Sequence, residues 1–153
     1  MKIIASFTIN HDLLDVGMYT SRVDSDVVTY DIRMKKPNAG EYLDDNGLHT
    51  FEHLFATFAR NSEYSDRVVY VGPMGCRTGF YFLVRDSISP QQAIKIVYDA
   101  FCFIADFEGT IPGSKRKECG NYTAHDLVAA KKYAKDMLPI LRDWTAEKLV
   151  YPR

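Results

Sequence analysis

The short connection between two strand-like segments near the start of the chain is the strongest constraint on its fold. Residues 18–23 and 27–34 are rich in β-branched and aromatic side chains, and only an Asp-Ser-Asp turn at 24–26 separates them. Because parallel strands require a crossover of about a dozen residues or more, this turn predicts an antiparallel hairpin.

Strand-like and helix-like segments follow this hairpin without a regular alternation. Two further strands are expected over residues 67–71 and 79–84, joined by a glycine-rich turn. Helices are expected over about 48–60, from Pro90 to the region of Gly109, and over about 122–138. This order favours an α+β fold with an antiparallel sheet over a regular βαβ arrangement with a parallel one.

Local signals place the helix boundaries. The first helix has Asp45 or Asn46 as its candidate cap, and Ser89 is expected to cap the second. Pro139 is expected either to kink the third helix or to start a fourth. The apolar stripes are Phe51, Leu54, Phe55 and Phe58 on the first helix, and Ile94, Val97, Tyr98, Phe101 and Ala105 on the second.

Length and composition bound the class of protein. A chain of 153 residues predicts one domain over 1–153, and a net charge of −1 without long charge runs argues against nucleic-acid partners. No segment has the apolar length of a membrane helix, and the N-terminus does not read as a signal peptide. Three cysteines are too few for a disulfide framework, so we expect reduced thiols and a cytoplasmic location.

The sequence His-Thr-Phe-Glu-His at 49–53 is the strongest chemical signal. On a helix, His49 and His53 lie one turn apart on one side and Glu52 borders them, while the apolar stripe points the other way. Two such imidazoles can bind one divalent metal, and a neighbouring carboxylate can move protons. The alternative is an ordinary solvated helix face.

Two histidines do not complete such a site, because a catalytic metal of this kind usually has three protein ligands and one open position. Cys119 lies in a polar loop beside Gly120 and suits a thiolate ligand. Cys102 lies in an apolar helix and is interpreted as a buried structural thiol. The candidates for the third ligand are Cys119, Cys76, Cys102, His11, His125 and any carboxylate.

Cys76 lies in the turn Gly-Pro-Met-Gly-Cys-Arg-Thr-Gly, whose glycines allow the backbone to approach a ligand closely. A cationic neighbour such as Arg77 favours the thiolate, which could then act as a base. A small side chain that merely fills the turn is the alternative, and the residues alone leave both open.

Taken together, these motifs resemble the S-ribosylhomocysteine lyase (LuxS) family of autoinducer-2 synthases, in the family's order and over nearly the whole chain. The matching segments are Ser6-Phe7 with His11, residues 30–33 with 37–38, 48–54 with 60–61, 72–81, and 118–122 with His125, Leu127, Ala130 and Lys131.

The resemblance implies one divalent metal per subunit, held by His49, His53 and Cys119. Fe²⁺ is the implied metal in the cell, and Zn²⁺ or Co²⁺ can substitute for it. Glu52 and Cys76 are the implied acid/base pair, with Cys76 kept ionised by Arg33 and the metal.

Substrate contacts and assembly are also implied by the resemblance. Ser6, His11 and Arg33 would line the substrate site, and Arg60 would either bind the homocysteine carboxylate or form a structural ion pair. The implied assembly is a homodimer with active sites at the interface. The implied fold is an antiparallel sheet covered on one face by helices.

The implied substrate is S-ribosylhomocysteine, and the implied products are homocysteine and 4,5-dihydroxy-2,3-pentanedione, the autoinducer-2 precursor of quorum sensing and a product of methyl-cycle recycling. The ribose carbonyl must migrate from C1 to C3 before the carbon–sulfur bond can break by β-elimination. Each step moves protons between carbons, so two proton carriers and one Lewis acid meet the requirement.

Position 70 departs from the family pattern, because Tyr70 stands where an Asp is common and is thought to contact the substrate amino group. The expected effect is confined to how the amino-acid end of the substrate is held.

Two other functions have related motifs. His-x-x-Glu-His also occurs in zinc peptidases, but these are longer and take a carboxylate as third ligand. A non-enzymatic zinc domain would have a closed four-ligand site. Loss of metal on mutation of Cys76 would favour that closed site.

Overall fold

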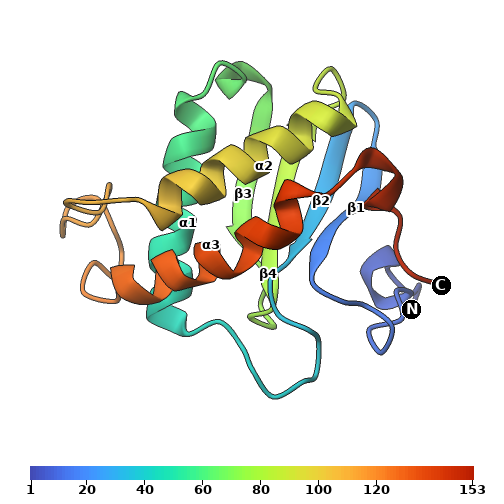
Figure 1. Cartoon of the computed structure of the whole chain (residues 1–153), viewed down its shortest axis with the longest axis horizontal. Coiled ribbons are helices and arrows are strands. Elements are labelled where there is room, and N and C mark those ends of the chain that lie inside the picture. The colour runs from blue at the N-terminus through green and yellow to red at the C-terminus, as the bar shows by residue number, and fades with distance from the viewer.

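A four-stranded antiparallel sheet forms the framework of the molecule in the computed structural model, which describes residues 1–153. Its strands are β1 (Gly17–Asp24), β2 (Val27–Arg33), β3 (Val68–Pro73) and β4 (Gly79–Arg85). The order across the sheet is β1-β2-β4-β3, so the two hairpins meet at β2 and β4 (Figure 1). The predicted hairpins and the α+β class are confirmed.

Three helices pack against the sheet: α1 (Asp45–Asn61), α2 (Pro90–Ala105) and α3 (Leu127–Arg142). Short 3-10 turns occur at Ala5–Phe7, Ser65–Arg67 and Ala146–Leu149. Figure 1 shows α2 and α3 crossing the sheet on the same side as α1. No helix is long and apolar enough to cross a membrane.

The first helix begins one residue earlier than either predicted cap allows. Asp44 is the cap, because its backbone is extended and its carboxylate accepts a hydrogen bond from the Gly47 amide. Asp45 and Asn46 are instead the first helical residues. Ser89 caps α2 as predicted, and that helix ends at Ala105, before the predicted stop near Gly109.

The third helix differs most from its prediction. It begins at Leu127 rather than near residue 122, because the Asp126 carboxylate accepts from the Ala129 amide and caps it there. It also continues through Pro139 to Arg142 instead of giving way to a fourth helix. The residues before Asp126 form turns, which leaves Cys119 on a loop.

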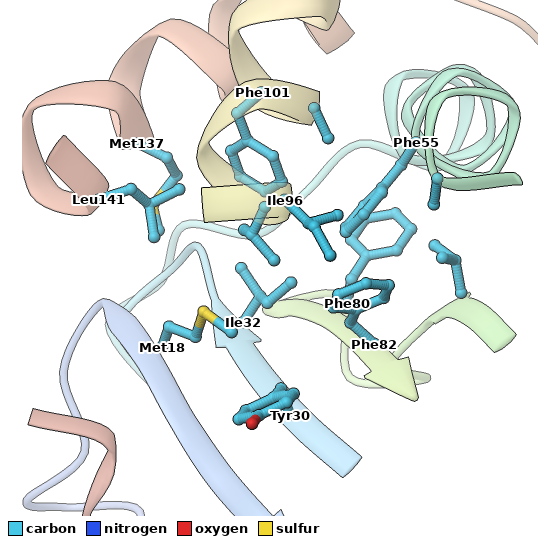
Figure 2. Packing of buried hydrophobic residues seen from close by; sticks show 14 of the residues in the cluster. Met18, Tyr30, Ile32, Phe55, Phe80, Phe82, Ile96, Phe101, Met137 and Leu141 are labelled. Atoms are coloured by element: carbon cyan, nitrogen blue, oxygen red, sulfur yellow. The ribbon is translucent and has the colours of Figure 1, made fainter. Parts of the chain in front are cut away.

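One hydrophobic cluster of 28 buried residues lies between the helices and the sheet. Phe51 and Phe55 of α1 meet Phe80 of β4 and Phe101 of α2, with ring centroids 4.9–6.3 Å apart. Figure 2 shows the rings of Phe55, Phe80 and Phe101 converging from the helical layer and the sheet. The predicted stripes of α1 and α2 therefore enter the core, except that Phe58 and Tyr98 are only partly buried against it.

The opposite face of the sheet is not covered by helices. On this face Tyr70 of β3 and Tyr81 and Leu83 of β4 are partly or fully exposed, whereas Phe80 and Phe82 on the other face of β4 are buried. Asp31 and Arg33 of β2 also belong to this face but are buried. Such alternation is typical of an antiparallel sheet with one face on the core. The molecule thus has a helical side and an open sheet side.

Candidate metal centre and thiol site

The two histidines of α1 are oriented by carbonyl groups from a distant loop. His49 Nδ1 lies 2.7 Å from the Ala124 carbonyl, and His53 Nδ1 lies 2.8 Å from the Pro112 carbonyl. A carbonyl can only accept, so each Nδ1 carries the proton and each Nε2 retains its lone pair. Both imidazoles are therefore fixed in the tautomer that binds a metal through Nε2.

Cys119 reaches this pair from the loop before α3. Its Sγ lies 3.4 Å from His49 Nε2, and the Asn121 amide donates a hydrogen bond to Sγ at 3.4 Å. The thiolate is the form of cysteine that binds metals. Sequence reasoning placed Cys119 first among the candidates, and the fold brings it to the histidines.

His125 is a fourth member of the group. Its ring stacks on His49 with centroids 4.1 Å apart, and its Nδ1 lies 2.9 Å from Thr50 Oγ1. Its Nε2 is buried without a hydrogen-bond partner. Burial and the neighbouring His49 and His53 lower the pKa of His125, so the neutral imidazole is favoured.

One donor atom from each of these four side chains lies within 4.8 Å of all the others. Two imidazole nitrogens with free lone pairs, a thiolate and an orphaned buried nitrogen suit a divalent transition metal such as Zn²⁺ or Fe²⁺. The donor set therefore fits a metal ion. Glu52 lies half-buried on α1 between His49 and His53 in the sequence, and its carboxylate is not a member of the group.

Cys76 occupies a different part of the molecule. It is exposed at the end of the β3–β4 hairpin, beside a cavity of about 280 Å³. The residues that line this cavity are Ser6, Phe7, Ile9, His11, Arg33, Pro73, Met74, Gly75, Cys76 and Tyr81. The predicted substrate residues Ser6, His11 and Arg33 are thus gathered around the thiol.

A network of buried polar side chains lies next to the Cys76 thiol. Arg33 is 2% exposed and donates from Nε and Nη2 to the two oxygens of Asp31, at 3.2 and 2.6 Å. Burial opposes its charge, but the attraction and hydrogen bonds of Asp31 prevail and raise the pKa of Arg33. Its Nη1 donates to Thr78 Oγ1 at 2.7 Å and lies 4.0 Å from Cys76 Sγ.

The metal group and the thiol do not share a cavity within one chain. None of His49, Glu52, His53, Cys119 or His125 lines the cavity beside Cys76. The histidines belong to the helical layer, whereas Arg33 follows the core residue Ile32 in β2 and so points to the open sheet face. The two groups therefore lie on different sides of one chain.

The remaining predicted residues lie elsewhere. Arg60 is exposed and donates to the Val69 carbonyl at 3.0 Å, and it makes no ion pair. Cys102 is half-buried within α2 rather than fully enclosed. Tyr70 is 51% exposed and lines a neighbouring cavity of about 320 Å³, which also includes Ser6 and Tyr81.

Sequence reasoning missed Asp31, Thr78 and Tyr151 as parts of the thiol site. Asp31 and Thr78 each lie two residues from a predicted site residue, a spacing that places side chains on one face of a strand. That periodicity was the available signal for Asp31. No local signal points to Tyr151, because it lies 120 positions from its partner.

Fold and site define a small α+β protein with a His and Cys group that could hold a metal ion on its helical side and an arginine-flanked thiol on its sheet side. The sequence model of the S-ribosylhomocysteinase (LuxS) family matches residues 4–148. The chain belongs to this family.

Curated relatives are similar over their whole length. The S-ribosylhomocysteine lyases of Phocaeicola vulgatus and Clostridium beijerinckii are each 46% identical to this chain, and the alignments cover 99% of it and 98% and 99% of those proteins. The S-ribosylhomocysteine lyase of Borreliella burgdorferi is 43% identical, with 99% of this chain and 100% of that protein covered.

Proposed function

We propose that this chain is an S-ribosylhomocysteine lyase, a carbon–sulfur lyase that converts S-ribosylhomocysteine to homocysteine and 4,5-dihydroxy-2,3-pentanedione. The observation that carries the proposal is the group of His49, His53 and Cys119, with both imidazoles held ready as ligands. Full-length similarity to proteins with this name supports the substrate. The product precedes autoinducer-2, and its formation would also recycle a methyl-cycle by-product.

A divalent ion bound here would supply Lewis acidity that polarises the substrate's carbonyl and hydroxyl oxygens. We assign His49, His53 and Cys119 as its ligands and Fe²⁺ as the resident ion, with Zn²⁺ or Co²⁺ as substitutes. His125 stacks on His49 and closes the group from the side. A fourth position would then remain for the substrate.

The proton transfers are assigned to Cys76 and Glu52. Carbonyl migration from C1 to C3 requires a proton to leave one carbon and arrive at its neighbour twice, and Cys76 as thiolate with Glu52 can carry these protons. Elimination then removes the C4 proton, forms a carbon–carbon double bond and breaks the C5–S bond. Glu52 of α1 is assigned to assist this step, and the released sulfur takes up a proton.

Substrate recognition is assigned to the cavity beside Cys76. Ser6 and His11 offer hydroxyl and imidazole groups to the sugar, and Arg33 adds a buried positive charge. The adjoining cavity lined by Tyr70 suits the amino-acid end of the substrate, where a phenol replaces the carboxylate common in the family. Arg60 is assigned a structural role through Val69, although binding of the homocysteine carboxylate in an assembled protein remains the alternative.

The separation of the thiol from the metal group supports a homodimer with shared active sites as part of the proposal. Apolar side chains of the N-terminal segment, Ile3, Ile4 and Phe7, are 53–76% exposed near the open sheet face. A second copy would cover them and present its metal group to the Cys76 cavity. Because both Cys76 and Cys119 must stay reduced, we also place the protein in the cytoplasm.

The test is turnover by metal-loaded protein under anaerobic conditions. Fe²⁺- or Co²⁺-loaded enzyme is incubated with S-ribosylhomocysteine, and free thiol is measured over time. We expect Cys76→Ser to retain its metal and to lose turnover by about hundredfold or more, because one proton carrier is gone. His49→Ala should lose the metal itself.

Cys102→Ala serves as the matched control, because this thiol lies in α2 outside both sites. It should keep both metal and turnover. Thiol release no greater than that of a Glu52→Ala variant would overturn the proposal. Loss of metal from Cys76→Ser would instead favour a closed, non-enzymatic zinc site.

A further inference from the structure

Tyr151, in the C-terminal segment, is hydrogen-bonded to the buried polar network next to Cys76. Its ring stacks on Tyr19 of β1 with centroids 5.2 Å apart, and its hydroxyl donates to Asp31 Oδ2 at 2.7 Å. Asp31 is fully buried, so this hydrogen bond is shielded from water. Neither the ligand group nor the substrate cavity includes Tyr151.

The Asp31 carboxylate is held on two sides. Arg33 binds both oxygens from one edge of its guanidinium, and Tyr151 binds Oδ2 from another direction. With Nε and Nη2 engaged in this way, Nη1 is the group directed at Thr78 and Cys76. The direction of Nη1 thus depends on how the carboxylate is fixed.

The hydrogen bonds between Arg33, Thr78 and Cys76 can all donate in one direction, toward the sulfur. Thr78 Oγ1 accepts a hydrogen bond from Arg33 Nη1 at 2.7 Å, so its own proton is available for Cys76 Sγ at 3.0 Å. A thiolate can accept that proton and benefits from the nearby guanidinium charge. Tyr151, Asp31, Arg33 and Thr78 therefore form a chain that ends at the sulfur.

We propose that Tyr151 is a positioning residue that favours the thiolate form of Cys76 through Asp31 and Arg33. It acts in two ways that reinforce each other. Its hydroxyl fixes the carboxylate that aims Arg33, and it disperses the negative charge of Asp31, which would otherwise oppose a thiolate.

The surroundings of both groups agree with this role. Burial and the negative charge of Asp31 raise the pKa of Tyr151, so its hydroxyl remains a donor at neutral pH and above. The other titratable or charged groups that face Cys76 are Arg33 from β2, Tyr81 from β4 and His11 from the N-terminal segment. Burial, followed by Asp31, raises the pKa of Tyr81, so it stays neutral as well.

The test is the rate at which iodoacetamide alkylates Cys76 in the metal-loaded, substrate-free protein, measured across pH. Mass spectrometry of the Cys76 peptide separates this thiol from Cys102 and Cys119. For Tyr151→Phe we expect alkylation at neutral pH to slow by about three- to tenfold, the cost of one weakened hydrogen-bond chain. The pH profile should shift to higher pH.

Tyr19→Phe is the matched control, because it removes a hydroxyl from the ring stacked on Tyr151. That hydroxyl donates to the Asp15 carbonyl rather than to Asp31. Its Cys76 profile should coincide with that of the unmodified protein, and thermal unfolding checks that both variants fold. An unchanged profile for Tyr151→Phe, or an equal shift for Tyr19→Phe, would overturn the inference.

The inference rests on the proposed function in one respect: the lyase reaction is what would use the Cys76 thiolate. Because alkylation needs no substrate, a lyase assay that fails leaves the alkylation result interpretable. If the protein is a lyase, Tyr151→Phe should also shift the acidic limb of its turnover profile to higher pH, with KM nearly unchanged. A fall in turnover that is equal at every pH would contradict the positioning role.

Discussion

Gly79 lies where β4 pairs with β2 directly opposite Arg33. A Cβ atom at this position would lie 2.0 Å from the Ile32 carbonyl oxygen and 3.2 Å from Arg33 Cα. Both contacts are with backbone, which cannot move aside as a flexible side chain does. The absence of one methyl group therefore lets the thiol-bearing turn approach the strand that carries its arginine.

We predict that Gly79→Ala lowers the free energy of unfolding by about 3 kcal/mol, because the strands must separate to admit the methyl group. Urea denaturation monitored by circular dichroism measures this loss. Gly75→Ala is the control in the same turn, since a Cβ there has no neighbour within 4 Å. Equal stabilities for the two variants would refute this explanation.

Residue spacing in the sequence found those parts of the site that are local. His49 and His53 are one helical turn apart, so their shared face follows from helix geometry. The carbonyls that orient them come from Pro112 and Ala124, far along the chain. Such contacts depend on how a loop packs, which no periodicity records.

At the scale of elements, α2 has the most complete set of local helix-start signals in its own sequence. Ser89 Oγ accepts from the Gln92 amide at 3.2 Å, and the Gln92 side chain accepts from the Ser89 amide at 2.8 Å. Pro90 follows in the first turn, where a missing amide proton has no cost. The helix therefore begins where the sequence predicts.

We predict that Ser89→Ala lowers the free energy of unfolding by about 1 kcal/mol, because the Gln92 amide in the first turn loses its acceptor. Ser87→Ala is the control, since only its backbone carbonyl takes part in a hydrogen bond. Chemical denaturation of the two variants side by side gives the comparison. A loss in Ser87→Ala as large as in Ser89→Ala would show that the cap is not responsible.

The start of α3 was mispredicted because apolar and small residues before Asp126 have no strong helix stop among them. Asp126 itself caps the helix, and Thr50 of α1 adds a tertiary contact, since its Oγ1 accepts from the Asp126 amide at 2.9 Å and contacts His125. A tertiary contact thus holds this amide outside the helix.

At the scale of the whole molecule, the separation of Cys76 from the metal group gives the shared-site proposal a direct test. In a dimer whose sites combine Cys76 of one subunit with Glu52 of the other, a mixed dimer of Cys76→Ser and Glu52→Ala subunits has one site with neither defect. Neither parent dimer has such a site.

We predict that co-expressed Cys76→Ser and Glu52→Ala chains recover about a quarter of wild-type turnover, because half of randomly formed dimers are mixed and each holds one intact site. Free thiol release from S-ribosylhomocysteine measures it. The control is each variant alone, which should be inactive. Co-expressed protein as inactive as its parents, although mixed dimers are found by mass spectrometry, would place both residues in one subunit's site.

The carbonyls that orient His49 and His53 lie on either side of Cys119 in the chain, at Pro112 and Ala124. An ion held by these three side chains would thus fasten the whole intervening segment to α1, with the basic residues 115–117 inside it. Removing the ion would free this loop from one of its attachments to α1, and it would also remove the Lewis acid from the site. Chelation would then be visible as new cleavage by a lysine- or arginine-specific protease, so metal occupancy would govern the lifetime of the chain as well as its activity.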